Sequence, residues 1–215
     1  MECKNKTLIQ CDFDGTITEK DVSFLILDAF AKGDWRAILK KYSDGEITVG
    51  EFNRRAFNLV AASKETMLGY IKDRVKIRDG FKEFVKLCQK KQFRFVIVSN
   101  GLDFYIEDLL KAQGLSDIEY HAAETRFASS GLIVKYIGPN GKEVNTEFKN
   151  KYVAHFLEQG YQVIYIGNGT SDFTAAKCCS RIFATDSLLE NCQRNGVGCV
   201  PFTNFNDIIE MFKSW

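Results

Sequence analysis

Apolar residues recur in two different patterns along this chain. Short, nearly continuous apolar runs occupy residues 7–12, 93–98 and 163–166, and each run ends in polar or glycine residues. Runs of this kind are typical of strands that are buried on both faces of a parallel sheet. Residues 81–90 and 103–111 instead carry apolar side chains at helical spacing. This alternation predicts an α/β fold, a Rossmann-like parallel sheet with helices on both faces.

One long segment departs from this alternation. Residues 21–78 show apolar positions at helical spacing, with no convincing strand among them. We therefore expect an all-helical cap that is inserted directly after the first strand. The predicted domains are an α/β core of residues 1–17 and 77–215 and a cap of residues 18–76.

The second half of the chain supplies the remaining elements. Residues 121–136 indicate a β-hairpin, and a helix is expected from about residue 152. A helix through residues 175–176, a short strand at 181–184 and two closing helices complete the prediction.

Two carboxylates mark the end of the first predicted strand. Asp12 and Asp14 point the same way if the strand continues through them, because side chains alternate along a strand. Like charges at that distance repel unless a cation or a shared proton relieves them, and Mg²⁺ is commonly held by one or two carboxylates, waters and substrate phosphate. Gly15 permits a tight turn, and Thr16 offers a hydroxyl and an N–H to an anion. A surface turn capped by carboxylates is the alternative interpretation.

The second strand ends in a potential anion seat. Ser99, followed by Asn100 and Gly101, offers a hydroxyl and backbone N–H groups that lead into a helix. Ser99 could equally be the N-cap of that helix. Because ligands bind outside the carboxyl ends of the strands in open α/β sheets, we expect this loop to meet the first one.

The third strand ends in Asn168, and Asp172 follows it closely. Both side chains offer oxygen ligands to the same edge of the sheet. A lysine is needed there to offset the charge of a bound phosphate, and Lys149 and Lys151 are the candidates.

Composition excludes several classes of protein. The 215 residues contain 29 Lys and Arg against 28 Asp and Glu, so the net charge of +1 provides no field for nucleic acid or an anionic membrane. The seven cysteines are scattered without Cys-x-x-Cys spacing, which argues against a disulfide framework or a zinc site. Residues 1–6 are polar and precede no signal-like apolar core, so we expect a cytoplasmic protein.

In order and spacing, these residues resemble the four motifs of the haloacid dehalogenase superfamily. The matching segments are Asp12 to Thr16, Ser99, Lys149 and Gly167 to Asp172, and the helical insertion resembles the C1 cap of that superfamily. The chain is most similar to the phosphoserine-phosphatase-like branch, and there to methionine-salvage phosphatases that act on 2-hydroxy-3-keto-5-methylthiopentenyl-1-phosphate. That closer likeness runs nearly end to end. It implies a Mg²⁺-dependent phosphatase of a small phosphorylated metabolite.

The resemblance also implies a role for each motif residue. Asp12 is the implied nucleophile that forms an aspartyl-phosphate, and Asp14 the implied acid and base. Lys149 is preferred to Lys151 because its spacing to Gly167 and Asn168 matches the family. The implied phosphate-binding residues are Thr16, Ser99, Asn100 and Gly101, together with Lys149. The implied metal ligands are Asp12, Asp14, Asn168 and Asp172.

One motif residue departs from the family pattern. Asn168 stands where relatives usually carry Asp, and an amide oxygen brings no negative charge to a metal. We expect a lower affinity for Mg²⁺. The chain is then either a natural variant that still turns over, or a low-activity or non-catalytic phosphate-binding relative.

The cap is expected to set the choice of substrate. In phosphoserine phosphatases an acidic residue after the first motif and an arginine of the cap bind the substrate. Asp21 matches the acidic residue. Ala56 stands at the position of the arginine, with Arg54 and Arg55 beside it. Phosphoserine therefore remains the alternative substrate. Four apolar cap residues suit either an uncharged tail or plain core packing: Phe24, Phe52, Phe57 and Leu59. The expected partner is a small phosphate ester, and a homodimer is left open.

Overall fold

The computed structural model describes residues 6–213, so Cys3 and most of the polar N-terminal segment lie outside the described residues. The first half of the chain forms β1 (Lys6–Cys11), α1 (Val22–Phe30), α2 (Trp35–Ser43), α3 (Val49–Phe57), α4 (Lys64–Ile71), α5 (Phe81–Lys90), β2 (Arg94–Leu102) and α6 (Asp103–Ala112). The second half forms β3 (Glu119–Ala128), β4 (Gly131–Ile137), β5 (Glu143–Val144), α7 (Phe148–Glu158), β6 (Tyr161–Gly167), the 3-10 turn Thr170–Asp172, α8 (Phe173–Ala176), β7 (Arg181–Ala184), α9 (Asp186–Arg194), β8 (Val200–Pro201) and α10 (Phe205–Lys213).

All these strands join one sheet in the order β5-β4-β3-β2-β1-β6-β7-β8. In the part of the sheet that runs β3-β2-β1-β6-β7-β8, all neighbouring strands are parallel. Strand β4 pairs with β3, and β5 with β4, in antiparallel fashion. In the central strand, Ile9 pairs with Phe95 of β2 on one side and with Ile164 of β6 on the other. The predicted α/β class and the hairpin are confirmed.

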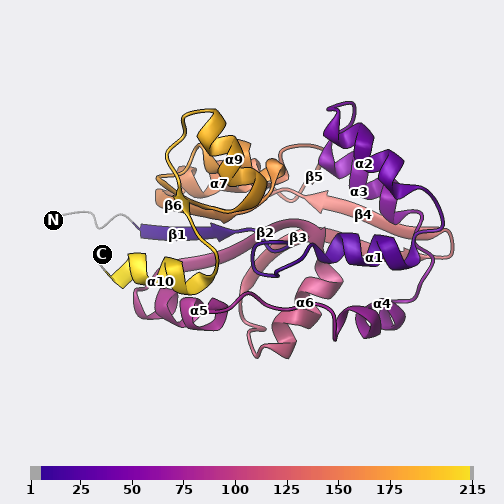
Figure 1. The fold of residues 1–215 in the computed structure, drawn as a ribbon, viewed down its shortest axis with the longest axis horizontal. Helices are drawn as coiled ribbons and strands as arrows, with labels where there is room; N and C mark the ends of the chain where they lie inside the picture. Colours follow the sequence, from indigo (N-terminus) through magenta and orange to yellow (C-terminus); the bar gives the residue numbers. More distant parts are fainter. Residues whose placement is uncertain (1–5, 214–215) are drawn as a thin grey trace.

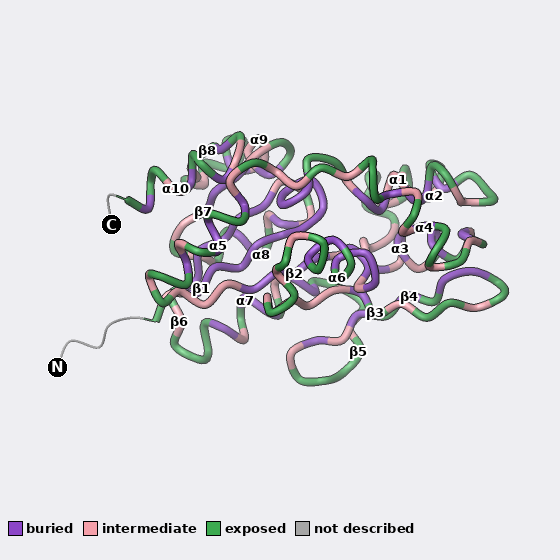
Figure 2. Tube along the Cα trace, turned by 90° about the horizontal axis from the view of Figure 1, so that it is seen from below, coloured by how far each residue is buried: buried purple, intermediate pink, exposed green. Residues whose placement is uncertain are grey.

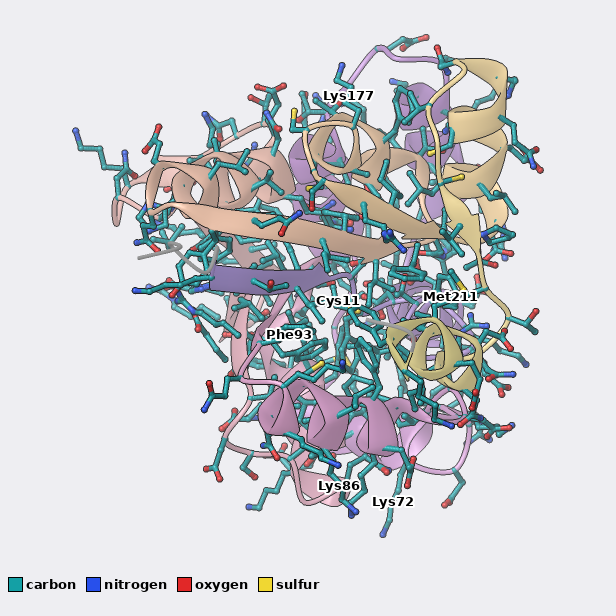
Figure 3. The ribbon with its side chains drawn as sticks, turned by 90° about the vertical axis from the view of Figure 1, so that its left-hand side faces the viewer. Cys11, Lys72, Lys86, Phe93, Lys177 and Met211 are labelled. Carbon is teal, nitrogen blue, oxygen red and sulfur yellow. The ribbon has the colours of Figure 1, made fainter. Side chains whose placement is uncertain are left out.

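Helices cover both faces of the sheet. In Figure 1, α7 and α9 lie on one side of it and α5, α6 and α10 on the other. Figure 3 views the same layers from the end, with Lys177 at the outer surface of one layer and Lys72 and Lys86 at that of the other. Burial follows from this arrangement: Figure 2 shows buried residues along the central strands and exposed ones around the periphery. The central strands β1, β2 and β6 are largely apolar and buried because both of their faces are covered.

The helical insertion leaves and rejoins the sheet at one place. Thr18 and Ile77 form an isolated antiparallel bridge, and Glu19 N donates to the carbonyl of Lys76 at 2.9 Å. All four helices between these points have a polar side-chain N-cap, which satisfies a free N–H of the first turn; the caps are Asp21, Asp34, Thr48 and Ser63.

The four helices do not form an isolated bundle. Helices α2 and α3 pack on each other, and α3 packs on β4, whereas α4 packs on α1 and on α6. The strand β4 therefore supports the insertion from the side of the sheet (Figure 1).

Several boundaries differ from the prediction. Strand β2 continues through Leu102 instead of ending at Ser99, with an irregular register between Val98 and Leu102. Helix α7 starts at Phe148 rather than near Tyr152. The preceding residue, Glu147, has a left-handed backbone with φ of 55° and makes no side-chain cap. The sequence therefore carries no capping signal for the start of this helix. The two-residue strands β5 and β8 are too short to leave a sequence pattern. Within residues 6–213, no helix has the length and apolar character needed to cross a membrane.

Candidate active site

A cavity of about 310 Å³ opens at the carboxyl ends of β1, β2 and β6. Its polar floor comes from the loops that follow β1 and β6, from the carboxyl-terminal part of β2 and from the first turn of α7. The floor residues are Asp12, Asp14, Ser99, Asn100, Gly101, Lys149, Asn168 and Gly169. Residues that lie up to 157 positions apart in the chain therefore meet here, as the topology predicted.

Lys149 lies at the centre of the floor. Its Nζ is 2.8 Å from Asp12 Oδ1 and 2.6 Å from Asp172 Oδ1, and its side chain is only 3% exposed. Burial, followed by the charge of Asp172, raises the pKa of the Asp12 carboxyl to about 7, while Lys149 opposes this rise. Burial disfavours the Lys149 ammonium, but the two carboxylates outweigh it and raise its pKa. Lys149 therefore compensates two buried acids. Lys151, two residues further along, is exposed.

Asp172 is held by four donors. Its Oδ1 accepts from Lys149 and from the Tyr165 hydroxyl at 2.7 Å, and its Oδ2 accepts from the backbone N–H groups of Asn168 at 3.1 Å and Gly169 at 2.8 Å. Asp172 therefore positions Lys149 and shapes the loop after β6. Because its oxygens are already engaged, we expect any support of a metal by Asp172 to run through water.

Both carboxylate oxygens of Asp14 also have donors. Oδ1 accepts from the backbone N–H of Val22 at 3.0 Å, and Oδ2 accepts from the Tyr105 hydroxyl at 2.5 Å. Burial, and then the charge of Asp21, raises the pKa of Asp14 well above its ordinary value. A carboxyl whose pKa is raised suits general acid chemistry.

Ser99 does not cap a helix. Its Oγ accepts from the N–H of Gly101 at 3.0 Å, and α6 begins only at Asp103, without any side-chain cap. The alternative reading of Ser99 as an N-cap is thus wrong. A Cβ at Gly101 would lie 2.2 Å from Asp14 Oδ2 and from the Tyr105 hydroxyl oxygen, so only glycine leaves room for that contact.

The loop after β1 is tied to its surroundings by side chains. The Thr16 hydroxyl, fully buried, donates to Asn168 Oδ1 at 3.0 Å and does not line the cavity. Gly15 has φ of 72°, which favours glycine. Arg78 donates to the carbonyls of Gly15 at 2.8 Å and Thr16 at 2.9 Å, a role that no sequence pattern indicated.

The oxygen donors suit Mg²⁺ only in part. Asp12 and Asn168 both line the cavity, and hard oxygen ligands of this kind are those that Mg²⁺ prefers. Residues 6–213 contain no group of three His, Cys, Asp or Glu side chains that could hold a metal. One carboxylate and one neutral amide therefore suit an ion that keeps several of its waters.

Three hydroxyl residues beyond β6 also line the cavity: Thr170, Ser171 and Ser187. The insertion provides a further wall, which is mostly apolar. The wall consists of Phe24, Leu39, Tyr42, Val49 and Phe52, with Asp21, Ser23 and Asn53 as its polar members. Phe57 is instead fully buried in the core, and Leu59 packs on Gly33.

Neither predicted cap arginine lines the cavity. Arg55 pairs with Glu51 at the surface, and Nη1 of Arg54 is buried without a hydrogen-bond partner among the described residues. Lys149 is therefore the one lysine or arginine in the cavity wall formed by residues 6–213.

Asn53 joins the insertion to residues 99–101, the candidate phosphate-binding segment at the end of β2. Its Nδ2 donates to the carbonyl of Asn100 at 2.9 Å and to the Tyr136 hydroxyl at 2.5 Å, and Tyr136 donates to the same carbonyl at 2.7 Å. Sequence reasoning missed Asn53 and Tyr105, because each lies within an amphipathic helix and no motif marks it.

Comparison with known proteins gives likenesses to a family model, to two relatives in sequence and to a solved structure. Residues 9–177 match the model of a family described as haloacid dehalogenase-like hydrolase. The chain is 32% identical to the 2-hydroxy-3-keto-5-methylthiopentenyl-1-phosphate phosphatase of Bacillus cytotoxicus, over 93% of each chain. It is 32% identical to the bifunctional enzyme MtnB/MtnX of Bacillus licheniformis over 94% of this chain and 48% of that protein, about half its length. A substrate-bound phosphoserine phosphatase shares the fold, with a TM-score of 0.74 at 18% identity, over 97% of this chain and 99% of that one.

Proposed function

Because the chain belongs to the haloacid dehalogenase-like hydrolases and is a phosphatase of that family, we propose that it hydrolyses a small phosphate monoester with an uncharged tail, with Mg²⁺ as cofactor. The observation that carries the proposal is the buried contact of Lys149 with Asp12 at the floor of the cavity. It joins a carboxylate nucleophile to a cation that can neutralise phosphoryl charge.

The first half of the reaction transfers the phosphoryl group to the protein. An oxygen of Asp12 attacks phosphorus as the bond to the ester oxygen breaks, which gives an aspartyl-phosphate and the free alcohol. Asp14 gives its proton to the departing ester oxygen. Lys149 and the Ser99 hydroxyl hold the phosphoryl oxygens, and such positioning with charge neutralisation is most of what phosphoryl transfer requires.

The second half releases inorganic phosphate. Asp14, now a carboxylate, takes a proton from a water molecule, whose oxygen attacks phosphorus and breaks the bond to Asp12. Both aspartates then return to their starting states. Asp12, the backbone carbonyl of Asp14 and Asn168 would hold Mg²⁺, with Asp172 in support through water; the ion supplies further neutralisation of phosphoryl charge.

The cavity wall supports the choice of substrate. Phe24, Tyr42 and Phe52 offer apolar surface, and Asp21 adds a carboxyl whose pKa burial raises to about 6. A substrate carboxylate would meet no cation in the apolar wall formed within residues 6–213, and Lys149 of the floor is already paired with Asp12 and Asp172. A thioether tail such as that named for the Bacillus cytotoxicus relative suits the wall better than phosphoserine does.

Phosphate release from a panel of esters tests the proposal. The two deciding substrates are 2-hydroxy-3-keto-5-methylthiopentenyl-1-phosphate and phosphoserine, each with Mg²⁺ titrated and with Asp12→Asn as the control. We expect metal-dependent release, faster from the first ester and abolished in the variant. Faster release from phosphoserine would overturn the substrate class. No release at any Mg²⁺ concentration would favour a non-catalytic phosphate-binding relative.

A further inference from the structure

Three buried groups form a chain of hydrogen bonds from the insertion to Asp14. The Ser23 hydroxyl lies 2.8 Å from the Tyr105 hydroxyl, which lies 2.5 Å from Asp14 Oδ2. Tyr105 is fully buried and Ser23 is 5% exposed, so these contacts are largely shielded from bulk solvent. Ser23 belongs to α1 and Tyr105 to α6, so the chain of contacts joins the insertion to the sheet domain.

The direction of these hydrogen bonds follows from the chemistry of the groups. An ionised carboxylate only accepts, so the Tyr105 hydroxyl donates to Asp14 and the Ser23 hydroxyl must donate to Tyr105. A protonated carboxyl keeps acceptor lone pairs, so both bonds persist in the same direction when Asp14 carries its proton, and that proton remains available to the substrate. Neither state leaves a buried polar group unpaired, which would otherwise cost stability.

Asp14 is also fixed from its other side. Its Oδ1 accepts from the Val22 N–H at 3.0 Å, so each carboxyl oxygen has one donor and the carboxyl plane cannot rotate without losing both. Resting on the proposed function, we propose that Tyr105 is a positioning residue that orients Asp14 toward the leaving oxygen of the substrate, with Ser23 as its support.

The leaving group of the substrate distinguishes this role from a structural one. p-Nitrophenolate leaves without a proton, whereas the alkoxide of β-glycerophosphate needs one from Asp14. We expect Tyr105→Phe to lower kcat/KM for β-glycerophosphate about tenfold or more, and for p-nitrophenyl phosphate by less than about threefold. The ratio kcat/KM is the right measure because it includes only the steps up to the departure of the alcohol, in which Asp14 acts as the acid. Ser23→Ala should also lower kcat/KM for β-glycerophosphate more than for p-nitrophenyl phosphate, by a smaller factor.

Tyr165→Phe is the matched control. Tyr165 is equally buried, and its hydroxyl contacts Asp172 at 2.7 Å instead of Asp14. Its loss should lower kcat/KM for both esters in the same proportion. An equal loss for both esters in Tyr105→Phe, or no loss in a variant that folds, would overturn the positioning role. If Tyr105→Phe does not fold, the shift in Ser23→Ala decides. Failure of the unaltered chain to hydrolyse either ester contradicts the proposed function, and the inference falls with it.

Discussion

Asn168 Oδ1 accepts a hydrogen bond from the Thr16 hydroxyl at 3.0 Å, which joins the loop after β6 to the loop after β1. A carboxylate can accept the same bond. Asn168→Asp should therefore keep this geometry while it adds a negative charge to the cavity that Asp12 also lines. We expect the half-saturating Mg²⁺ concentration to fall about tenfold, since ligand charge strengthens binding of hard cations.

Calorimetric titration of Mg²⁺ into both proteins would measure this change independently of turnover, and phosphate release would follow its effect on the rate. Equal Mg²⁺ affinity in the two proteins would mean that residue 168 does not face the metal.

Lys149→Met should damage both activity and stability. The variant leaves Asp12 and Asp172 buried beside each other without their cation, and loss of one partner of a buried ion pair costs about 3–5 kcal/mol. Phosphate release should fall about a thousandfold. Lys151→Met on the same helix is the control, because Lys151 is exposed and its removal should change the free energy of unfolding by less than about 0.5 kcal/mol. Similar urea denaturation curves for both variants would contradict the assignment.

Asn53→Ala should weaken the attachment of the insertion to residues 99–101 of β2. The change removes both bonds from Nδ2, to the Asn100 carbonyl and to the Tyr136 hydroxyl. At a net value of about 1 kcal/mol for each bond, the two bonds together are worth about 2 kcal/mol, so we expect KM for p-nitrophenyl phosphate to rise about thirtyfold. The exposed Asn58, at the end of the same helix, gives the control Asn58→Ala, whose KM should stay unchanged. A rise in both variants would point to a general effect on α3.

Glu119 gives a pH-dependent contribution to stability that lies away from the cavity. Hydrogen bonds from His121 and then Arg94 lower its pKa from 4.5 to about 2, although burial opposes them. Since the folded pKa lies below the ordinary value, the contribution is complete above pH 4.5 and is lost as pH falls toward 2.

Glu119→Gln should accordingly lower the free energy of unfolding at pH 7 by about 1 kcal/mol or less, because the side chain is 37% exposed and solvent screens the pair. Urea unfolding at pH 7 and pH 3 would measure the difference, which should shrink at the lower pH. Glu158→Gln, at an exposed position of α7, is the control. A difference that stays constant between the two pH values would contradict the assignment to this carboxylate.

The α/β class, the family and the phosphatase class were predictable because strong local signals carry them. Asp12 and Asn168 each follow a buried apolar strand and Ser99 lies near the end of another, and strand ends in a parallel sheet must meet at one edge. The spacing to Asn168 also separated Lys149 from Lys151, and the structure brings Lys149 to Asp12.

The contacts from the helices were not predictable in this way. Tyr105 and Asn53 face the site only because α6 and α3 pack at particular angles, which depend on tertiary contacts and not on helical periodicity. Arg54 shows the converse: its place beside the family's arginine position suggested a substrate contact, yet it does not line the cavity.

The bridge between Thr18 and Ile77 makes the insertion a detachable part of the architecture. Its two ends are hydrogen-bonded neighbours, with Arg78 N also donating to the Ile17 carbonyl at 2.7 Å, so a short turn could close the gap if residues 19–76 were removed. The sheet would keep its strand order, since no strand lies within that segment. A different lid grafted at this point would change the molecules that the cavity accepts, provided that it also supplies the contacts that Val22 and Ser23 make to Asp14 and Tyr105.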